Sequence, residues 1–339
     1  MGISFSFKDP NFGKGTIAKG DQTSIPLFEY NFPKTMKILI ATEKPFAAAA
    51  VASMTEIIEA AGIQVVKLEK YTEKNQLLEA VADVDGIIIR SDIVDAEVLD
   101  AAKNLKIVVR AGAGYDNIDL AAATAHNVVA MNTPGQNANA VAELVFGMLL
   151  FQCRNQFSGA AGTELKGKTL GLHAFGNVAR NVARVAQGFG MDVYAYDPFL
   201  SKEQIEAGVK YCATIPELYS QCQYVSLHCP ATKETIGSIN YDLLKSMPKN
   251  ACLINTARKE VIDEAGVMQL MEERPDFKYI ADVKPATAEQ FVEKFGTRVF
   301  FTPKKSGAQT AEANSNAGIA AAKQACGFLK EGIDRFRVN

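Results

Sequence analysis

A short run of small residues in the middle of the chain could bind a dinucleotide. Ala174, Gly176 and Ala179 fill the small-residue positions of a GxGxxG fingerprint, after an apolar strand pattern and at the start of a helical one. Small residues there permit a tight turn, and the N–H groups of Gly176, Asn177 and Val178 at the helix start can face a pyrophosphate. Such a string alone is weak evidence, because Ala and Gly are common at strand–helix turns.

An acidic residue stands where a dinucleotide site requires one. The next apolar strand ends at Asp197, close to the separation of about 20 residues that the fingerprint leads us to expect. A carboxylate at this place binds the adenosine ribose hydroxyls and repels a 2′-phosphate, so the sequence predicts NAD rather than NADP. The alternative is that Asp197 and Pro198 only begin a loop. His173, on the strand before the turn, is interpreted as structural.

Composition narrows the class of protein. The 339 residues carry 36 Lys plus Arg and 38 Asp plus Glu, which gives a net charge of -2. This length suits two domains, and no basic excess is available to bind nucleic acid. No apolar run is long enough to span a bilayer, so we expect no membrane partner. The six cysteines form no CxxC pair and no signal segment is evident, so we expect buried reduced thiols in the cytoplasm and no metal site.

Apolar runs alternate with helical patterns from Met36 onward. Runs that are apolar on both faces and alternate with helices indicate parallel sheets covered on both sides. The expected strands are Lys37–Ala41, Gln64–Leu68, Gly86–Ile89, Lys106–Val109 and Val128–Asn132, and, in a second set, Thr169–Leu172, Asp192–Tyr196, Tyr224–Leu227, Ala251–Asn255, Tyr279–Val283 and Val299–Phe301. The expected helices are Ala47–Ala61, Lys74–Ala82, 137–152, Val178–Gly188 and 313–331.

The two sets predict an α/β fold of two Rossmann-like domains with an interdomain cleft. The helix 137–152 is apolar nearly all round, so we expect it to be buried between the domains. We assign residues 36–133 together with 313–339 to a substrate-binding domain and residues 134–312 to an NAD-binding domain. Residues 1–35 lack clear periodicity and are interpreted as an extension without a catalytic role.

Several motifs occur in an order that resembles one enzyme family. They are RAGAGYDNID at 110–119, NTPG at 132–135 with AEL at 142–144, VSLHCP at 225–230, INTAR at 254–258 and GAQT at 307–310. Together they resemble the D-isomer-specific 2-hydroxyacid dehydrogenases, and the similarity extends from about Met36 to the C-terminus. The resemblance implies hydride transfer between a 2-hydroxy acid and NAD, by a homodimer formed through the cofactor domain.

The resemblance assigns parts of this chemistry to particular residues. Oxidising a 2-hydroxy acid needs a cation on the carboxylate, a base for the hydroxyl proton, and a nicotinamide close to the substrate carbon. Arg258 matches the family's arginine, whose guanidinium can bind a carboxylate through two hydrogen bonds and keeps its charge. The N–H groups of Gly112, Ala113 and Gly114 can form a nest for the same carboxylate, although an ordinary strand–helix turn is the alternative.

The base is where the sequence departs from the family. Most members carry His after a Thr-Pro pair and orient it with Glu from an Asp-Val-Phe-x-x-Glu-Pro run. Here Asp282 is followed by Val-Lys-Pro, and Lys304 and Lys305 follow the Thr-Pro pair. Burial and neighbouring cations lower the pKa of a lysine, which lets it act as a base. Counting forward from the Thr-Pro pair indicates Lys304, counting back from Gly307 favours Lys305, and two solvated surface lysines are the alternative.

Further residues match positions that line the cofactor in the family. Asp282 matches the aspartate that binds the nicotinamide carboxamide, and Thr256 and Ala257 match residues behind the nicotinamide ring. A nucleophilic role for Cys229 is not indicated, because no His–Cys pair at catalytic spacing is evident. Besides the fingerprint residues and Asp197, the expected cofactor contacts are Cys229, Pro230, Thr232, Thr256, Ala257, Arg258 and Asp282.

Arg90 bears on the choice of substrate. It follows the strand Gly86–Ile89 and matches the arginine that phosphoglycerate dehydrogenases use for the substrate phosphate, with a rim salt bridge as the alternative. Lys44 is a second candidate. The chain is most similar to short phosphoglycerate dehydrogenases in which Lys replaces His, which implies oxidation of D-3-phosphoglycerate to 3-phosphohydroxypyruvate in serine synthesis. The alternatives are another acid, such as hydroxypyruvate, glyoxylate or D-lactate, and a protein that senses NAD without turnover.

Overall fold

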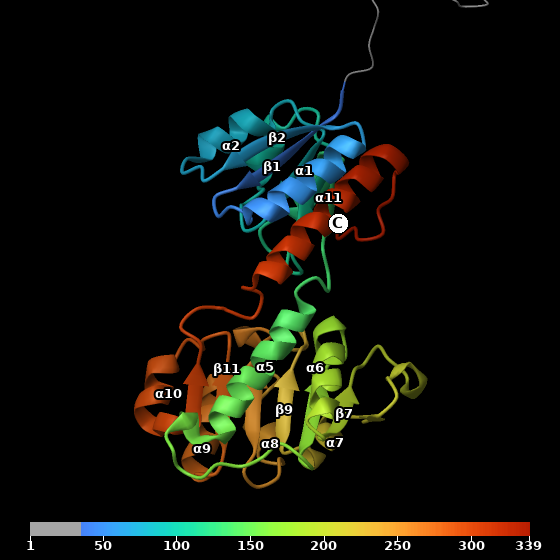
Figure 1. Ribbon diagram of the computed structural model, residues 1–339. Coiled ribbons are helices and arrows are strands. Elements are labelled where there is room, and N and C mark those ends of the chain that lie inside the picture. The colour runs from blue at the N-terminus through green and yellow to red at the C-terminus, as the bar shows by residue number, and fades with distance from the viewer. Residues whose placement is uncertain (1–34) are drawn as a thin grey trace, which may run out of the picture. The chain divides into compact units, whose positions relative to one another are not determined.

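The described part of the chain contains two parallel sheets and the helices that connect their strands. The computed structural model describes residues 35–339, so the prediction for the N-terminal extension lies almost wholly outside the described residues. Within each sheet the neighbouring strands run parallel (Figure 1). This arrangement confirms the predicted α/β class with two parallel sheets.

The first sheet has the strand order β2-β1-β3-β4-β5. Alternate residues of β1 enter two core clusters: Ile38 and Ile40 pack on one face, and Leu39 and Ala41 pack on the other. Both faces of the sheet are therefore buried, which is why the inner strands β1 and β3 are almost wholly apolar, whereas the edge strand β2 also carries polar residues. The strands are β1 Lys37–Thr42, β2 Gln64–Glu69, β3 Gly86–Ile89, β4 Ile107–Arg110 and β5 Val129–Asn132.

The second sheet has the order β12-β11-β10-β9-β6-β7-β8. Leu253 and Ile254 of its strand β10 pack into separate core clusters, so this sheet is also covered on both faces. Fully burying one such side chain stabilises the fold by about 1.5–3 kcal/mol. The strands are β6 Thr169–His173, β7 Asp192–Tyr196, β8 Val209–Tyr211, β9 Tyr224–Leu227, β10 Cys252–Asn255, β11 Lys278–Ala281 and β12 Val299–Phe301.

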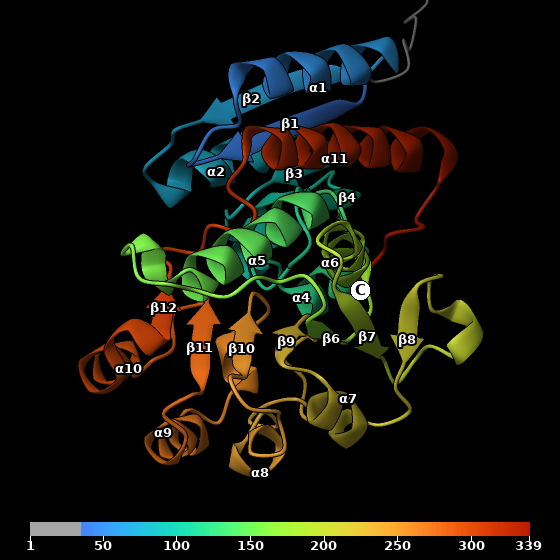
Figure 2. The ribbon, with the colours of Figure 1, turned by 60° about the horizontal axis from the view of Figure 1, so that its bottom comes forward.

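Two helices from opposite ends of the described chain lie side by side on the first sheet. α11 packs along α1 and against β3 and β4 (Figure 1, Figure 2). α5 packs on α6 and also contacts β11, β12 and α11. The helices are α1 Ala48–Ala60, α2 Lys74–Val81, α3 Ala96–Ala101, α4 Leu120–Ala125, α5 Ala138–Cys153, α6 Asn177–Gly188, α7 Ile215–Gln221, α8 Tyr241–Leu244, α9 Glu264–Glu273, α10 Ala288–Phe295 and α11 Ala311–Glu331.

The structure contains short elements that the apolar patterns did not predict. They are α3, α4, α7, α8, α9, α10 and the three-residue strand β8. Side-chain caps begin several of these helices: Asp95 accepts the N–H of Val98, and Asp263 accepts the N–H of Gly266. Each cap satisfies a donor that the first turn leaves free, so a helix too short to show clear periodicity can still form.

The six cysteines are free and buried, as predicted for reduced thiols. Among residues 35–339, no helix is long and apolar enough to cross a membrane. No group of three or more His, Cys, Asp and Glu side chains in that part of the chain is arranged to hold a metal ion.

Candidate active site

The carboxyl ends of three neighbouring strands bring the expected catalytic residues together. β10, β11 and β12 are hydrogen-bonded in that order and run parallel, so the loops that follow them leave the same edge of the sheet. Arg258 lies in the loop after β10, Asp282 follows β11, and Lys304 and Lys305 lie in the loop after β12. Ligands of open α/β sheets bind beyond this edge.

A side chain closes the turn that carries Arg258. The Asn255 amide accepts the N–H of Ala257 at 2.9 Å and donates to the carbonyl of Arg258 at 2.9 Å. The guanidinium donates to the Ala257 carbonyl at 3.0 Å, and its Nη2 lies 3.3 Å from the point that a Cβ would occupy on Gly114. The guanidinium therefore reaches the loop Gly112–Gly114, which follows the first sheet.

That loop keeps free donors beside the guanidinium. The N–H groups of Ala113 and Gly114 donate no hydrogen bond within residues 35–339, whereas that of Gly112 donates to the Arg110 carbonyl at 2.9 Å. A Cβ on Gly112 would overlap the Arg110 guanidinium, so any other residue there would make that side chain move. Two of the three N–H groups expected to form an anion nest are thus available to a ligand.

Arg110 is a site residue that the sequence analysis quoted only as part of a motif. It ends β4 and pairs with Ile89, the last residue of β3, while Arg90 directly follows β3. Nε of Arg110 donates to the Arg90 carbonyl at 3.0 Å. Burial, and then the positive charges of Arg90 and Arg258, lower the pKa of Arg110. The signal in the sequence was an arginine directly after each of the expected strands Gly86–Ile89 and Lys106–Val109.

These arginines line a pocket of about 360 Å³ that contains no carboxylate side chain. Arg90 donates from Nη1 to the carbonyls of Lys44 and Pro45, each at 3.1 Å, and from Nη2 to Oδ1 of Asn314 at 2.6 Å. These neutral acceptors orient the guanidinium, and burial lowers its pKa against the opposing charge of Asp92. The lining comprises Lys44, Arg90, Ser91, Arg110, Ala111, Gly112, Asn137, Ala308, Gln309, Ala313, Asn314 and Ala317.

The two candidate lysines differ in their surroundings. Burial, and then the charge of Arg258, lower the pKa of Lys305, although part of its side chain stays exposed. Lys304 and Lys305 are both exposed residues, and neither ammonium group forms an ion pair within residues 35–339. The surroundings that an amine base requires therefore exist at Lys305. The charged groups that act on Lys305 are Arg258, Asp282, Arg110 and Asp116.

Asp282 is buried, and its carboxylate binds the loop that carries both lysines. Oδ1 accepts the hydroxyl of Thr302 at 2.8 Å and the N–H of Ser306 at 2.6 Å. Oδ2 accepts the N–H of Gly307 at 2.8 Å. One lone-pair position, on Oδ2, remains for another donor such as the nicotinamide carboxamide that the family resemblance assigns to Asp282.

Asp197, which follows β7, binds the turn between β6 and α6 that carries the fingerprint residues. Asp197 accepts the N–H of Phe175 at 2.8 Å through Oδ2 and that of Phe199 at 2.9 Å through Oδ1. Ala174 has a φ of 74°, a left-handed conformation that glycine adopts at less cost. A Cβ built on Gly176 would have no neighbour within 4 Å, and no side chain caps α6, so the first N–H groups of the helix are open to a ligand.

Buried polar atoms without partners lie at the same edge of the second sheet. Oγ1 of Thr256 and Nε2 of His228 are buried and have no hydrogen-bond partner among the described residues. His228 follows β9 and Thr256 follows β10. Leaving buried polar atoms unpaired is costly, and a bound dinucleotide offers donors and acceptors for them. Together with Asp197 and the open start of α6, these residues fit an NAD molecule.

The other expected cofactor contacts lie in the loops after β9 and β10. Cys229 and Ala257 are buried, whereas Pro230 and Thr232 are exposed. Thr235 connects these two exposed residues, because its hydroxyl accepts the N–H of Thr232 at 2.7 Å and donates to the Pro230 carbonyl at 2.6 Å. Burial raises the pKa of Cys229 to about 11, which keeps the thiol neutral and agrees with the absence of a nucleophilic role.

The three histidines lie outside the loop that carries the lysines. Nε2 of His126, an exposed residue, lies 2.8 Å from Asp100. His173 contacts the Tyr219 hydroxyl at 3.0 Å, and burial lowers its pKa to about 4, in keeping with its structural interpretation. Burial also lowers the pKa of His228 to about 3. Both buried imidazoles are therefore neutral at pH 7.

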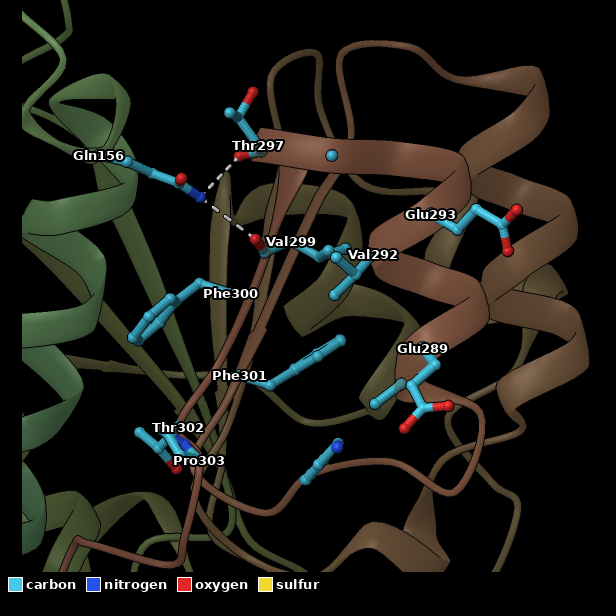
Figure 3. A pocket seen from close by; sticks show the side chains of 13 residues that line it. Gln156, Glu289, Val292, Glu293, Thr297, Val299, Phe300, Phe301, Thr302 and Pro303 are labelled. Carbon is cyan, nitrogen blue, oxygen red and sulfur yellow. Dashed lines mark hydrogen bonds between the residues drawn. The ribbon is translucent and has the colours of Figure 1, made fainter.

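A larger pocket, of about 650 Å³, contains none of the expected site residues. It lies beside β12 and α10, and Figure 3 shows the Gln156 amide donating to the carbonyls of Thr297 and Val299, at 3.2 Å each. The side chains of Val292 and Phe301 contribute to its apolar lining. Pocket size alone therefore does not locate the chemistry of this protein.

Comparisons with known proteins agree with this geometry. Residues 150–303 match the family described as D-isomer specific 2-hydroxyacid dehydrogenase, NAD binding domain. The chain is 35% identical over 270 residues to hydroxypyruvate reductase of Thermotoga maritima, a match that covers 74% of this chain and 86% of the relative. It is 34% identical over 274 residues to D-3-phosphoglycerate dehydrogenase of Methanocaldococcus jannaschii, covering 74% of this chain and 51% of the relative.

A solved structure is similar over most of the chain. The NAD+-bound 3-phosphoglycerate dehydrogenase of Entamoeba histolytica is 48% identical, with a TM-score of 0.80, covering 90% of this chain and 99% of that chain. Against the longer Methanocaldococcus jannaschii relative, in contrast, the chain spans only about half of that protein's length. These findings confirm the family resemblance and the NAD cofactor. The chain belongs to the D-isomer specific 2-hydroxyacid dehydrogenase family and is an NAD-dependent enzyme.

Proposed function

We propose that the chain oxidises D-3-phosphoglycerate to 3-phosphohydroxypyruvate. The observation that carries this proposal is the pocket in which Lys44, Arg90 and Arg110 gather without a carboxylate. A phosphate dianion would compensate these charges through charge-assisted hydrogen bonds, whereas an unphosphorylated acid would bring no such charge to the pocket. The similarity to phosphoglycerate dehydrogenases supports the same substrate class.

In the proposed reaction, Arg258, Lys305 and the free N–H groups of the Gly112–Gly114 loop each have a role. Arg258 and the free N–H groups of Ala113 and Gly114 hold the substrate carboxylate. Neutral Nζ of Lys305 accepts the proton of the C2 hydroxyl while the C2 hydrogen leaves with its electron pair as hydride. NAD, when bound, supplies the hydride acceptor. Arg258 also stabilises the carbonyl oxygen that forms at C2.

Positive charge beside Lys305 favours this assignment of the base. An ammonium group cannot accept a proton, so the base must be neutral when substrate binds. Burial and Arg258 lower the pKa of Lys305 and thereby raise the neutral fraction near physiological pH. The charges of the site residues Arg258 and Asp282 act on Lys305, which supports Lys305 over Lys304.

A substrate comparison tests the proposal. We expect kcat/KM with NAD to be at least about 100-fold higher for D-3-phosphoglycerate than for D-glycerate, because two or more charge-assisted contacts are lost without the phosphate. D-lactate should be as poor as D-glycerate. Equal kcat/KM values for phosphorylated and unphosphorylated acids would overturn the proposed substrate.

The same assay decides between the proposal and its alternatives. A preference for hydroxypyruvate over 3-phosphohydroxypyruvate in the reverse direction would indicate the activity named for the Thermotoga maritima relative. NAD binding without turnover of any 2-hydroxy acid would instead indicate a sensor.

We also propose a cytoplasmic homodimer in which residues 36–133 with 313–339 bind substrate and residues 134–312 bind NAD. Light scattering on the purified chain tests the dimer, and a monomer at micromolar concentration would contradict it.

A further inference from the structure

Apart from a backbone bond at Thr302 and hydrogen bonds within its own turns, the loop that carries Lys305 is bound through Asp282. It leaves β12 at Phe301 and reaches α11 at Ala311 without forming a regular element of its own. Lys305 makes no side-chain hydrogen bond or ion pair within residues 35–339. The position of its amine therefore depends on where the backbone of the loop is held.

Three donors from this loop converge on the Asp282 carboxylate. They flank Lys305 on both sides: the Thr302 hydroxyl comes before it, and the N–H groups of Ser306 and Gly307 come directly after it. Gly307 can approach this closely because it has no side chain, since a Cβ there would lie 3.0 Å from Oδ2 of Asp282 and 3.3 Å from Val141.

We propose that Asp282 is a positioning residue that fixes the loop Thr302–Gly307 and so places the Lys305 amine at the site. Hydrogen bonds to an ionised acceptor are about twice as strong as neutral ones, so a carboxylate suits this task better than an amide. Asp282 is 1% exposed, and a buried carboxylate needs such donors. The proposal rests on the proposed function, which makes Lys305 the base.

The proposal also accounts for the departure of this sequence from its family pattern. The glutamate that would orient a histidine base is missing from the run after Asp282, which reads Val-Lys-Pro. An amine has no second ring nitrogen through which a carboxylate could orient it. In this chain the Asp282 carboxylate instead binds the backbone N–H groups of the two residues that follow Lys305.

Two substitutions separate positioning from simple charge. Asp282→Asn keeps the size of the side chain, but its NH2 group cannot accept an N–H, so at least one bond to the loop is lost. Asp116→Asn is the matched control, because Asp116 also acts on Lys305 by charge yet forms no hydrogen bond to the loop. Both carboxylates raise the pKa of Lys305, whereas burial and Arg258 lower it more strongly.

The two variants should therefore shift the Lys305 pKa in opposite directions. In Asp116→Asn only a negative charge is lost, so the pKa falls. In Asp282→Asn the loosened loop takes Lys305 away from burial and from Arg258, so the pKa rises toward its ordinary value of about 10.4. Trace acetylation of the apoprotein over a pH series, read by peptide mass spectrometry, measures the pH at which the Lys305 amine is half protonated. The measurement needs no turnover.

Kinetics and cofactor binding complete the test. We expect Asp282→Asn to lower kcat about tenfold or more and to raise the NAD dissociation constant by a smaller factor, because a misplaced base impairs proton transfer whereas Asp282 offers the cofactor one hydrogen bond among several contacts. Asp116→Asn should keep kcat at alkaline pH within about threefold. Thr302→Val removes one of the three donors to the carboxylate and keeps the Asp282 charge, so it should give a smaller loss of kcat. It replaces the Asn variant in the test if that variant does not fold.

Three results would overturn the proposal. A Lys305 midpoint that moves in the same direction in both variants would mean that Asp282 acts on Lys305 only through its charge. A large rise in the NAD dissociation constant with an unchanged Lys305 midpoint would make Asp282 a cofactor ligand instead. An unchanged kcat and midpoint in Asp282→Asn would show that the loop does not need it. Failure of the wild type to oxidise D-3-phosphoglycerate would contradict the proposed function, while the acetylation midpoints would still test the positioning.

Discussion

The loops at the carboxyl ends of the two sheets hold their charged residues in opposite ways. On the first sheet, carbonyl oxygens and a neutral amide accept the hydrogen bonds of the Arg90 guanidinium, so no carboxylate is bound to it directly. On the second sheet, the side chains of Asn255 and Asp282 bind backbone groups and thereby fix the loops that carry Arg258 and Lys305. The first edge keeps charge available for a ligand, whereas the second edge fixes geometry for a reaction.

The largest expected effect comes from removing the amine at the second edge. Lys305→Met should lower kcat about 10²- to 10⁴-fold, the usual contribution of a positioned general base. Lys304→Met is the matched control, and its kcat should stay within about threefold of wild type because Lys304 has no role in the proposed reaction. Steady-state assays of both variants at one alkaline pH make the comparison, and equal losses would reject the assignment to Lys305.

The first edge should control substrate choice rather than rate. Arg90→Ala or Arg110→Ala should raise KM for D-3-phosphoglycerate about 10- to 100-fold, since a hydrogen bond to a charged group contributes about 1.5–3 kcal/mol. KM for D-glycerate should change little, because that substrate lacks the phosphate. Similar increases for both substrates would mean that these arginines bind the carboxylate or support the fold instead of selecting a phosphate.

The pH dependence should report the lowered pKa of the Lys305 amine. A base must be neutral, so kcat/KM should rise with pH through the Lys305 pKa, and burial and Arg258 place that rise below the ordinary lysine value of about 10.4. Initial rates over a pH series, corrected for enzyme stability, measure the midpoint. A rate that is flat from about pH 6 to about pH 10 would contradict a lysine base.

The smallest expected effect lies at the cofactor turn. Ala174→Gly removes the cost of a left-handed alanine, about 1–2 kcal/mol, and adds the chain entropy of glycine, about 0.5–1 kcal/mol. The free energy of unfolding should therefore rise by about 1 kcal/mol or less, which calorimetry would detect as a slightly higher Tm. KM for NAD should not change. A lower Tm would show that the alanine methyl group contributes more through packing than its backbone conformation costs.

The sequence predicted the strands that are buried on both faces of a sheet. Strands such as Gly86–Ile89 and Tyr224–Leu227 occur with the predicted bounds, because they are apolar on both faces and end at polar residues. The short helices α9 and α10 were not predicted, although Asp263 before α9 is a cap signal. Strand β8 has only three residues, none of them buried, so no apolar pattern marks it.

The candidate site was harder to derive because its geometry depends on distant contacts. Spacing could not choose between Lys304 and Lys305, since the direction of each side chain in an irregular loop is set by bonds to Asp282, more than twenty residues earlier. Arg110 was not singled out for a similar reason. Its place beside Arg90 follows from the pairing of β3 with β4, which the sequence does not state.

Chemical rescue tests the central claim, that a neutral amine at position 305 takes the substrate proton. Lys305→Ala removes the amine and leaves space for a small exogenous one such as methylamine. We predict that its activity toward D-3-phosphoglycerate rises in proportion to the concentration of the free-base form of the amine, and that Lys304→Ala shows no such dependence. No rise at any amine concentration, with NAD binding intact, would contradict the account.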